Sequence, residues 1–324
     1  MEASKLHQQC IVFDAHCDSI LDVLEDKRTL EQRSSEGHLD LPRLMKGGVT
    51  AQIFAIYVRR EYLGRAAHQT LRALDAFHAL FDRCTDDVIL ATTAADVERA
   101  KADGKIAAII AIEGAESLEG ELALLRVYHR LGVRNLGITW SLRNRAADGV
   151  NETRTGGGLT NFGVELVEEM NRLGIMIDVA HLAPAGVRDV LEISQSPVIA
   201  SHANAHALRS VARNLTDQQL EGIARTGGVV GVTFVPYFLD EDWKRASLGY
   251  LLDHIDYIVK VAGIDHVGLG SDFDGFPPPP PTGLEDATCF PNITVGLLER
   301  GYGEDDVRKV LGGNFMRVFR QVCG

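Results

Sequence analysis

Short apolar segments and amphipathic helical patterns alternate along this chain, and the alternation constrains the fold more than any other feature. Eight apolar segments lie near residues 10–16, 49–57, 105–113, 133–140, 174–181, 197–202, 227–235 and 266–272. Most are continuously apolar, as is typical of parallel strands buried on both faces. Helical spacing of apolar residues occurs in segments 65–81, 121–131, 162–173, 216–226, 247–262 and 304–322. Strands and helices that alternate in this way predict a (β/α)8 TIM barrel of the α/β class.

An open, doubly wound sheet is the alternative arrangement. A nucleotide-binding sheet of that kind carries a glycine-rich fingerprint between an early strand and the next helix. This chain has none there, and its GGVVGV segment (227–232) begins a strand instead. The barrel is therefore favoured. It is expected to form one domain over residues 1–324, because no internal repeat or flexible linker divides the chain.

Two insertions interrupt the alternation. Residues 19–48 separate the first two predicted strands, and residues 276–290 follow the eighth. The second insertion contains five consecutive prolines, which favour a stiff, extended loop over a helix. Both insertions are expected at the mouth of the barrel, where active-site loops lie.

Composition excludes several classes of protein. The net charge of −12 disfavours a nucleic-acid partner, because binding to a phosphate backbone calls for a basic surface. No segment approaches the roughly 18 consecutive apolar residues of a membrane-spanning helix, and the first residues lack the apolar core of a signal peptide. The five cysteines are scattered, so a reduced, cytoplasmic setting is expected. The oligomeric state stays open, a homodimer included.

Potential metal ligands stand at the ends of several predicted strands. His16 and Asp18 end the first, and Glu113, His181 and His202 end the third, fifth and sixth. Because the carboxyl ends of barrel strands meet at one face, these nitrogen and oxygen atoms are expected to converge there. Divalent metals in such a site turn water into a nucleophile near neutral pH. The pattern therefore predicts metal-dependent hydrolysis.

Each of these ligands has an ordinary structural explanation when it is taken alone. His16 and Asp18 face the same side of a strand, but such a pair occurs often by chance. A buried carboxylate is costly unless it is paired or metal-bound, which favours Glu113 as a bridge between two metals over a role as a helix cap. Asp178 is expected to orient one of the histidines from behind. The joint presence of all these residues favours the metal site.

Asp272, in the segment GLGSDFDG, ends the eighth predicted strand. An acid at this position can accept a proton from water and then donate it to a leaving amine. Asp274, two residues further on, is the competing candidate. Of the other histidines, His206 is expected in a loop and His266 at the start of a strand. Surface or helix positions are expected for His7, His38, His68, His78 and His129.

These residues lie in motifs that resemble the membrane (renal-type) dipeptidase family of zinc peptidases. The motifs follow the order and spacing of that family over nearly the whole chain: FDAHCD, GVTAQIF, AIEGAESL, GVRNLGIT, DVAHL, SHANAHAL, RNLTD, GLGSDFDG and GGNFMRVF. The resemblance implies a (β/α)8 barrel of the metallo-dependent hydrolase type with two zinc ions at its mouth. It also implies cleavage of dipeptides whose amino and carboxyl termini are both free.

The resemblance assigns a role to each ligand. It implies that His16 and Asp18 hold one zinc ion, that His181 and His202 hold the other, and that Glu113 bridges both. A hydroxide between the two metals would attack the peptide carbonyl. A catalytically silent barrel used only for binding would need a broken ligand set, and all five ligands are present.

Two further roles come from the same resemblance. Asp272 corresponds to the proton shuttle of the family. Arg213, in the motif Ala-Arg-Asn, corresponds to the arginine that grips the substrate carboxylate, which a guanidinium group can bind with two parallel hydrogen bonds. Arg209 is the nearby arginine with no such expected role.

Trp140 departs from the family pattern, because well-studied members place a histidine there, at the end of the fourth strand. Tryptophan offers one N–H donor and no titratable group. We expect the Trp140 indole to line the substrate pocket and to change the choice of substrate. The same residue supports an alternative activity, in which a related metal amidohydrolase acts on N-acyl amino acids or other small amides.

The expected setting also follows from the family comparison. Eukaryotic members carry signal and lipid-anchor segments, and neither is seen in this sequence. A soluble, microbial branch of the family without membrane association is therefore expected, with dipeptides as the partners.

Overall fold

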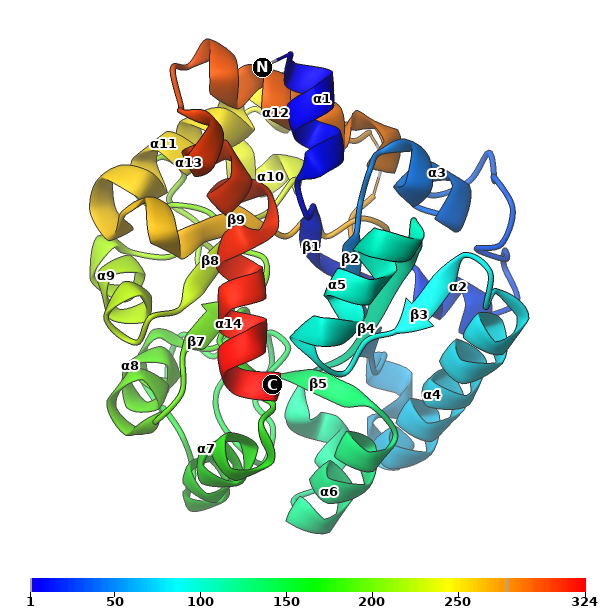
Figure 1. Cartoon of the computed structure of the whole chain (residues 1–324). Helices are drawn as coiled ribbons and strands as arrows, with labels where there is room; N and C mark the ends of the chain where they lie inside the picture. Colours follow the sequence, from blue (N-terminus) through cyan, green and yellow to red (C-terminus); the bar gives the residue numbers. More distant parts are fainter. Residues whose placement is uncertain (1, 278) are drawn as a thin grey trace.

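The computed structural model describes residues 2–277 and 279–324, and its strands form a closed parallel barrel surrounded by helices (Figure 1). The barrel strands are β1 (Phe13–Cys17), β2 (Ala51–Tyr57), β4 (Ile106–Glu113), β5 (Val133–Gly137), β6 (Met176–Asp178), β7 (Val198–Ala200), β8 (Val229–Val232) and β9 (Val267–Leu269). The sheet closes because β1 pairs with β9, with Asp14 opposite Leu269. The predicted (β/α)8 barrel is confirmed.

A further strand, β3 (Val88–Leu90), was not predicted from the sequence. It pairs with the first half of β4, along the edge that β5 occupies further on. β2 pairs directly with β4 in unbroken register, from Ala51 opposite Ala107 to Tyr57 opposite Glu113. β3 is therefore an addition beside the barrel and takes no part in its closure.

Helices surround the barrel and close one of its ends, as Figure 1 shows. They are α1 (Ala3–Gln9), α2 (Ile20–Leu24), α3 (Leu41–Lys46), α4 (Ala66–Arg83), α5 (Ala94–Asp103), α6 (Leu122–Arg130), α7 (Asn161–Leu173), α8 (Pro184–Ile193), α9 (Asp217–Arg225), α10 (Pro236–Leu239), α11 (Leu248–Ala262), α12 (Phe290–Glu299), α13 (Glu304–Arg308) and α14 (Asn314–Cys323). Helices occur in all six segments with predicted helical spacing. The first insertion contains α2 and α3.

The predicted single helix over 304–322 is wrong in one respect. A π-helical turn, Lys309–Gly313, separates α13 from α14. A side chain at Gly312 would place its Cβ 2.3 Å from the carbonyl oxygen of Ile11. The helix therefore changes course where it passes closest to the start of β1.

The insertion over 276–290 begins without helix among its described residues, and α12 starts only at Phe290. The prolines at 277 and 279–281 lie in this non-helical part, while Pro278 lies outside the described residues. An extended segment in place of a helix is what the proline run predicts.

Continuous apolar strands are explained by burial on both faces. One set of side chains, including Phe13, Ile53 and Ile109, points into the barrel, and the alternate set packs under the outer helices. α14 closes the end of the barrel at which the strands begin, and Phe315 stacks on Phe13 with 5.4 Å between ring centroids. Figure 1 shows α14 crossing this end. The opposite end, where the strands finish, is left for the site.

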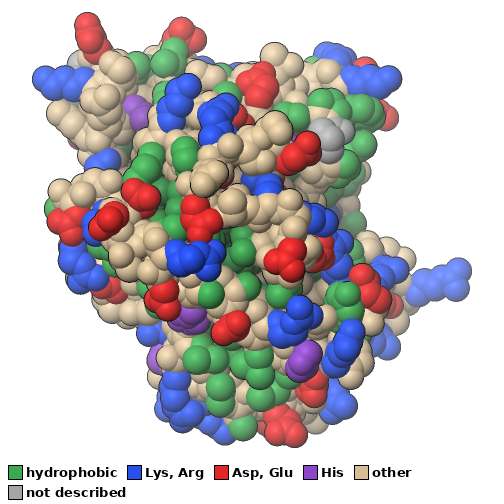
Figure 2. Space-filling model, turned by 90° about the vertical axis from the view of Figure 1, so that its right-hand side faces the viewer, with side chains coloured by type: hydrophobic (Ala, Val, Ile, Leu, Met, Phe, Trp, Pro, Cys, Tyr) green, Lys and Arg blue, Asp and Glu red, His purple; other side chains and the backbone are tan. Residues whose placement is uncertain are grey.

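Surface charges do not segregate on the face shown in Figure 2. Acidic and basic side chains are interspersed there, with hydrophobic side chains between them, among the described residues. Within residues 2–277 and 279–324, no helix has both the length and the apolar character needed to cross a bilayer.

Candidate metal centre

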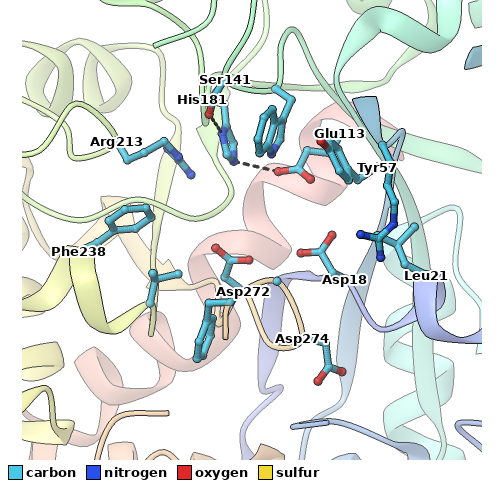
Figure 3. Close-up of a pocket in the computed structure, with 15 residues that line it drawn as sticks. Asp18, Leu21, Tyr57, Glu113, Ser141, His181, Arg213, Phe238, Asp272 and Asp274 are labelled. Carbon is cyan, nitrogen blue, oxygen red and sulfur yellow. Dashed lines mark hydrogen bonds and ion pairs between the residues drawn. The ribbon is translucent and has the colours of Figure 1, made fainter. Parts of the chain in front are cut away.

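A cavity of about 330 Å³ opens where the barrel strands finish. Its wall includes Asp18, Glu113, His181, Arg213 and Asp272. Figure 3 shows the carboxyl groups of Asp18, Glu113 and Asp272 converging on its centre from different elements. The strand-end ligands predicted from the sequence are thus brought together.

Glu113, the last residue of β4, stands at the middle of the cluster. Its Oε1 lies 3.0 Å from Nε2 of His181, 3.5 Å from Nε2 of His202 and 3.8 Å from Nε2 of His16. Nε2 of His16 also lies 3.7 Å from Oδ2 of Asp18. One carboxylate oxygen therefore faces the histidines of both predicted metal positions.

The spacing of these atoms fits divalent metal ions. Two ligands that each lie about 2.1 Å from a tetrahedral zinc ion are separated by about 3.4 Å. The separations of 3.5, 3.7 and 3.8 Å are close to this value and too long for good hydrogen bonds, whereas Nε2 of His181 lies closer, 3.0 Å from Oε1 of Glu113. Nε2 of His16 is buried and has no hydrogen-bond partner among the described residues. The histidine and carboxylate donors are also those that zinc accepts.

Two overlapping groups of ligand atoms lie within 4.8 Å of one another. One consists of His16, Glu113 and His202, and the other of His16, Asp18 and Asp272. His181 joins the first group through its Nε2, which lies 2.9 Å from Nε2 of His202. His16 belongs to both groups, so the two groups form one continuous cluster of potential ligands.

The electrostatics of the cluster favour a cation at its centre. Burial raises the pKa of Glu113 well above its ordinary value. His16 lowers this pKa in part, while the negative charges of Asp18 and Asp272 raise it further. Burial opposes protonation of His16, yet Glu113 and Asp18 overcome it and raise the pKa of His16 to about 10. These carboxylates are therefore stabilised as anions only where positive charge is supplied beside them.

His181 and His202 are in the form that binds metals. Burial lowers the pKa of each well below its ordinary value, and the positive charges of Arg213 and His16 lower both further. Each imidazole is therefore neutral at neutral pH, with a lone pair available on one ring nitrogen.

Two serines hold these imidazoles from behind. Oγ of Ser141 lies 2.7 Å from Nδ1 of His181, and Oγ of Ser201 lies 2.8 Å from Nδ1 of His202. Ser201 also donates to Oδ2 of Asp178 at 2.5 Å, so its oxygen is free to accept the Nδ1 proton of His202. Nε2 of His202 is then left unprotonated toward the cluster.

Sequence reasoning missed both serines. Asp178, which was expected to orient a histidine from behind, reaches His202 through Ser201. The Ser201–His202 dipeptide was visible in the sequence, yet serine has too many ordinary roles for it to be a signal alone.

Asp272 lies after β9, with its carboxyl group beside that of Asp18. Burial raises the pKa of Asp272 to about 7; His16 opposes this shift and Asp18 adds to it. A divalent metal beside the group would lower that pKa. The position suits a group that exchanges protons at the metal centre.

Arg213 also lines this cavity. Its Nη2 donates to the carbonyl oxygen of His202 at 3.0 Å, and its guanidinium group stacks over Phe238 at 5.5 Å. Its Nε is buried and has no hydrogen-bond partner among the described residues. Arg209 instead bonds the carbonyl oxygen of Tyr237 and does not line the cavity.

The Trp140 indole forms part of the cavity wall. Its ring lies 5.0 Å from that of Tyr57 and 5.7 Å from the imidazole of His181, nearly parallel to the latter. Tyr57 and Phe238 also line the cavity, and sequence reasoning singled out neither of them. Aromatic residues in core strands and short helices give no signal that separates a pocket wall from the core.

A barrel whose strand ends bring histidines and carboxylates into one cavity defines the class of metal-dependent hydrolases. The chain belongs to the membrane dipeptidase family, peptidase family M19, because a model of that family matches residues 1–323. The resemblance seen in the sequence motifs is therefore confirmed, and it makes the protein a hydrolase of the dipeptidase class.

Several known proteins are similar to this chain. Dipeptidase aclJ of Aspergillus oryzae is 36% identical over 299 residues, covering 88% of this chain and 70% of that protein. The crystal structure of dipeptidase AC, a family M19 metallo peptidase, is 35% identical with a TM-score of 0.91, covering 97% of this chain and 99% of that one. A metallo peptidase from Rhodobacter sphaeroides, liganded with a phosphinate mimic of the dipeptide L-Ala-D-Ala, is 34% identical with a TM-score of 0.88 and the same coverage.

Proposed function

We propose that this protein is a dipeptidase that holds two zinc ions and hydrolyses dipeptides with free amino and carboxyl termini. The observation that carries the proposal is the placement of one Glu113 oxygen 3.0–3.8 Å from Nε2 of three histidines, in the same cavity as Arg213. Membership of the membrane dipeptidase family supports it. The phosphinate dipeptide mimic bound by the Rhodobacter sphaeroides relative supports the substrate class.

His16 and Asp18 would hold one zinc ion and His181 and His202 the other, with Glu113 shared between them. Metals bound there would acidify water and polarise the scissile carbonyl. Ser141 and Ser201 would keep the two imidazoles aimed at the cluster. This division of the ligands makes the metal centre a binuclear one.

Asp272 would take up the proton of the attacking water and return it to the departing amine, since its carboxyl group adjoins both the metal cluster and the cavity. Arg213 would hold the carboxyl terminus of the substrate with the donors that face the cavity. A cavity of about 330 Å³ is near the small end of ligand sites, so longer peptides should fit poorly.

One experiment tests the function as a whole. Zinc-loaded protein is incubated with a dipeptide library, and the released amino acids are identified. Free and N-acetylated forms of the cleaved dipeptides are then compared. Cleavage of free dipeptides alone is expected, whereas faster cleavage of the acetylated forms would favour the amidohydrolase alternative, which Trp140 motivates.

The two insertions and the barrel are proposed to form one domain over residues 1–324. Leu21 from the first insertion and Phe276 from the second both line the cavity, which supports this view. Each insertion thus contributes to the site as well as to the fold.

Replacing Arg213 by alanine should raise KM for dipeptides by roughly 10–100-fold, as expected for the loss of charge-assisted hydrogen bonds. Steady-state kinetics on a free dipeptide and on its C-terminal amide provide the measurement. The amide should be a poor substrate for the wild type and should lose little further in the variant. Arg209→Ala is the control, and an equal penalty on acid and amide would contradict the assigned role.

Replacing Trp140 by histidine or phenylalanine should change the ranking of kcat/KM over a dipeptide panel, because the indole forms part of the cavity wall. If the indole N–H assists the reacting carbonyl, phenylalanine should lower kcat and histidine should restore part of it. Trp243→Phe is the control, since Trp243 does not line the cavity. An unchanged ranking with a shift in melting temperature alone would show that Trp140 is structural.

A further inference from the structure

Asp274 is a buried carboxylate that lines the cavity but turns away from the metal centre. It follows Asp272 by two residues, and its side chain is 5% exposed. In Figure 3 the carboxyl groups of Asp272 and Asp18 point into the cavity, whereas that of Asp274 points in the opposite direction. A buried charge in this position needs partners of its own.

The partners of Asp274 all come from the first insertion. Arg28 donates from Nη2 to Oδ2 at 2.5 Å, Ser19 donates its hydroxyl to the same oxygen, and the backbone N–H of His38 donates to Oδ1 at 2.5 Å. In return, the backbone N–H of Asp274 donates to Nδ1 of His38 at 3.1 Å. His38, expected at the surface or on a helix, is instead buried in a loop. Asp274 is therefore committed to these bonds and does not face the reacting groups.

Arg28 is itself fixed at other points. Its Nε donates to Asp22 at 2.8 Å and its Nη1 donates to the carbonyl oxygen of Leu39 at 2.6 Å. The side chain of Arg28 is 6% exposed. The insertion and the loop after β9 are thus joined by a buried ion pair that is anchored on both sides.

The loop that carries Asp272 has an unusual backbone. Asp272 and Asp274 have φ angles of 63° and 67°, in the left-handed region that residues other than glycine seldom adopt. Such conformations persist where the surroundings hold them in place. The N–H of Asp18 bonds the carbonyl oxygen of Phe273 at 2.9 Å, which ties one side of this turn to β1. The bonds of Asp274 tie the other side.

Gly275 connects this turn directly to both cavity carboxylates. A Cβ on Gly275 would lie 2.1 Å from Oδ1 of Asp272 and 2.2 Å from Oδ2 of Asp18. Both carboxyl groups therefore pack against the backbone of the residue that follows Asp274. Movement of Asp274 would displace the surface on which they rest.

We propose that Asp274 is a positioning residue, which holds Asp18 and Asp272 at the metal centre by tying their loop to Ser19, Arg28 and His38. Asp274 has no proton-transfer role of its own, so it and Asp272 are not interchangeable. The kinetic part of this inference rests on the proposed dipeptidase function. The structural part can be measured separately.

The chain offers a matched control for the substitution Asp274→Asn. Asp40 is a second buried carboxylate of the first insertion, and it accepts bonds from Nε of Arg43 at 2.8 Å and from the backbone N–H of Ser34 at 3.0 Å. It does not line the cavity. Asp40→Asn therefore removes the same charge from a similar ion pair without touching the loop of Asp272.

Two measurements are compared at equal folded fraction. In zinc-loaded Asp274→Asn, kcat for the best dipeptide should fall about 10–100-fold with KM changed by less than about 3-fold, as for other residues that orient a metal site. In cobalt-substituted protein, the visible absorption spectrum should shift in the same variant, because the ligand geometry changes. Asp40→Asn should leave kcat within about 2-fold of the wild type, since the groups at the metal centre keep their places, and should leave the spectrum unchanged.

Normal kcat and an unchanged cobalt spectrum in Asp274→Asn would overturn the inference, as would equal losses in Asp40→Asn. If Asp274→Asn does not fold, Ser19→Ala removes one bond of the same network and should shift both readouts in the same direction, and no shift there would also overturn it. A wild type that cleaves no dipeptide would refute the proposed function, while the cobalt spectra would still decide the role of Asp274.

Discussion

Replacing Asp272 by asparagine should lower kcat by about 10²–10⁴-fold while two metal equivalents remain bound. General acid–base groups contribute accelerations of this size, and asparagine has nearly the same shape as aspartate but cannot carry the proton. The measurement combines steady-state kinetics on a cleaved dipeptide with metal analysis of the dialysed protein. KM should change little, because Asp272 acts on the proton and not on the substrate carboxylate.

Asp265→Asn is the control for this substitution. Asp265 precedes β9 at the other end of the barrel and pairs with Lys309 at 2.8 Å, so it should not affect turnover. Near-normal kcat in Asp272→Asn, with an unchanged pH profile, would show that a group other than Asp272 transfers the proton. Loss of metal in that variant would show instead that Asp272 serves mainly as a ligand.

Glu113→Gln should weaken metal binding at both positions, by more than the 10–100-fold typical of residues that only orient a ligand. One Glu113 oxygen faces all three histidines, so both ions would lose a charged donor when the carboxylate becomes an amide. Isothermal titration of the metal-free protein with zinc measures the two affinities. Activity at limiting zinc should fall in parallel.

Glu121→Gln removes the same charge from an exposed residue near the start of α6 and serves as the control. Weakening of only one zinc site in Glu113→Gln would show that Glu113 is not shared between the metals. Unchanged affinity at both sites would exclude Glu113 as a ligand.

The barrel was predictable because its strands carry a strong signal. Most of the eight are continuously apolar, since one face packs inside the barrel and the other under the helices. β3 spans only Val88–Leu90 and borders β4 outside the closed ring, so it lacks that pattern. α5 was missed although Thr93 and Asp96 form a capping box at its start, because its few buried residues give weak periodicity.

The part of the site that could be predicted consists of the metal ligands that lie at the carboxyl ends of barrel strands. Strand order places Glu113 and His202 at one face of any such barrel, whatever the loops do. The direction of Asp274 could not be predicted, because it depends on a left-handed backbone and on three partners at least 236 positions away in the sequence. Loop conformations of this kind are decided by tertiary contacts, which local patterns do not encode.

The barrel closes where β1 pairs with β9. The carboxyl groups of Asp18 and Asp272 lie on either side of that strand pair. Asp14 pairs with Leu269, and the N–H of Asp272 bonds the carbonyl oxygen of His16 at 3.1 Å, between residues from nearly opposite ends of the chain. Parting this single strand pair would separate Asp18 from Asp272 and leave each helix intact. On warming, activity would therefore be lost when β1 and β9 separate, while circular dichroism would still record a helical protein.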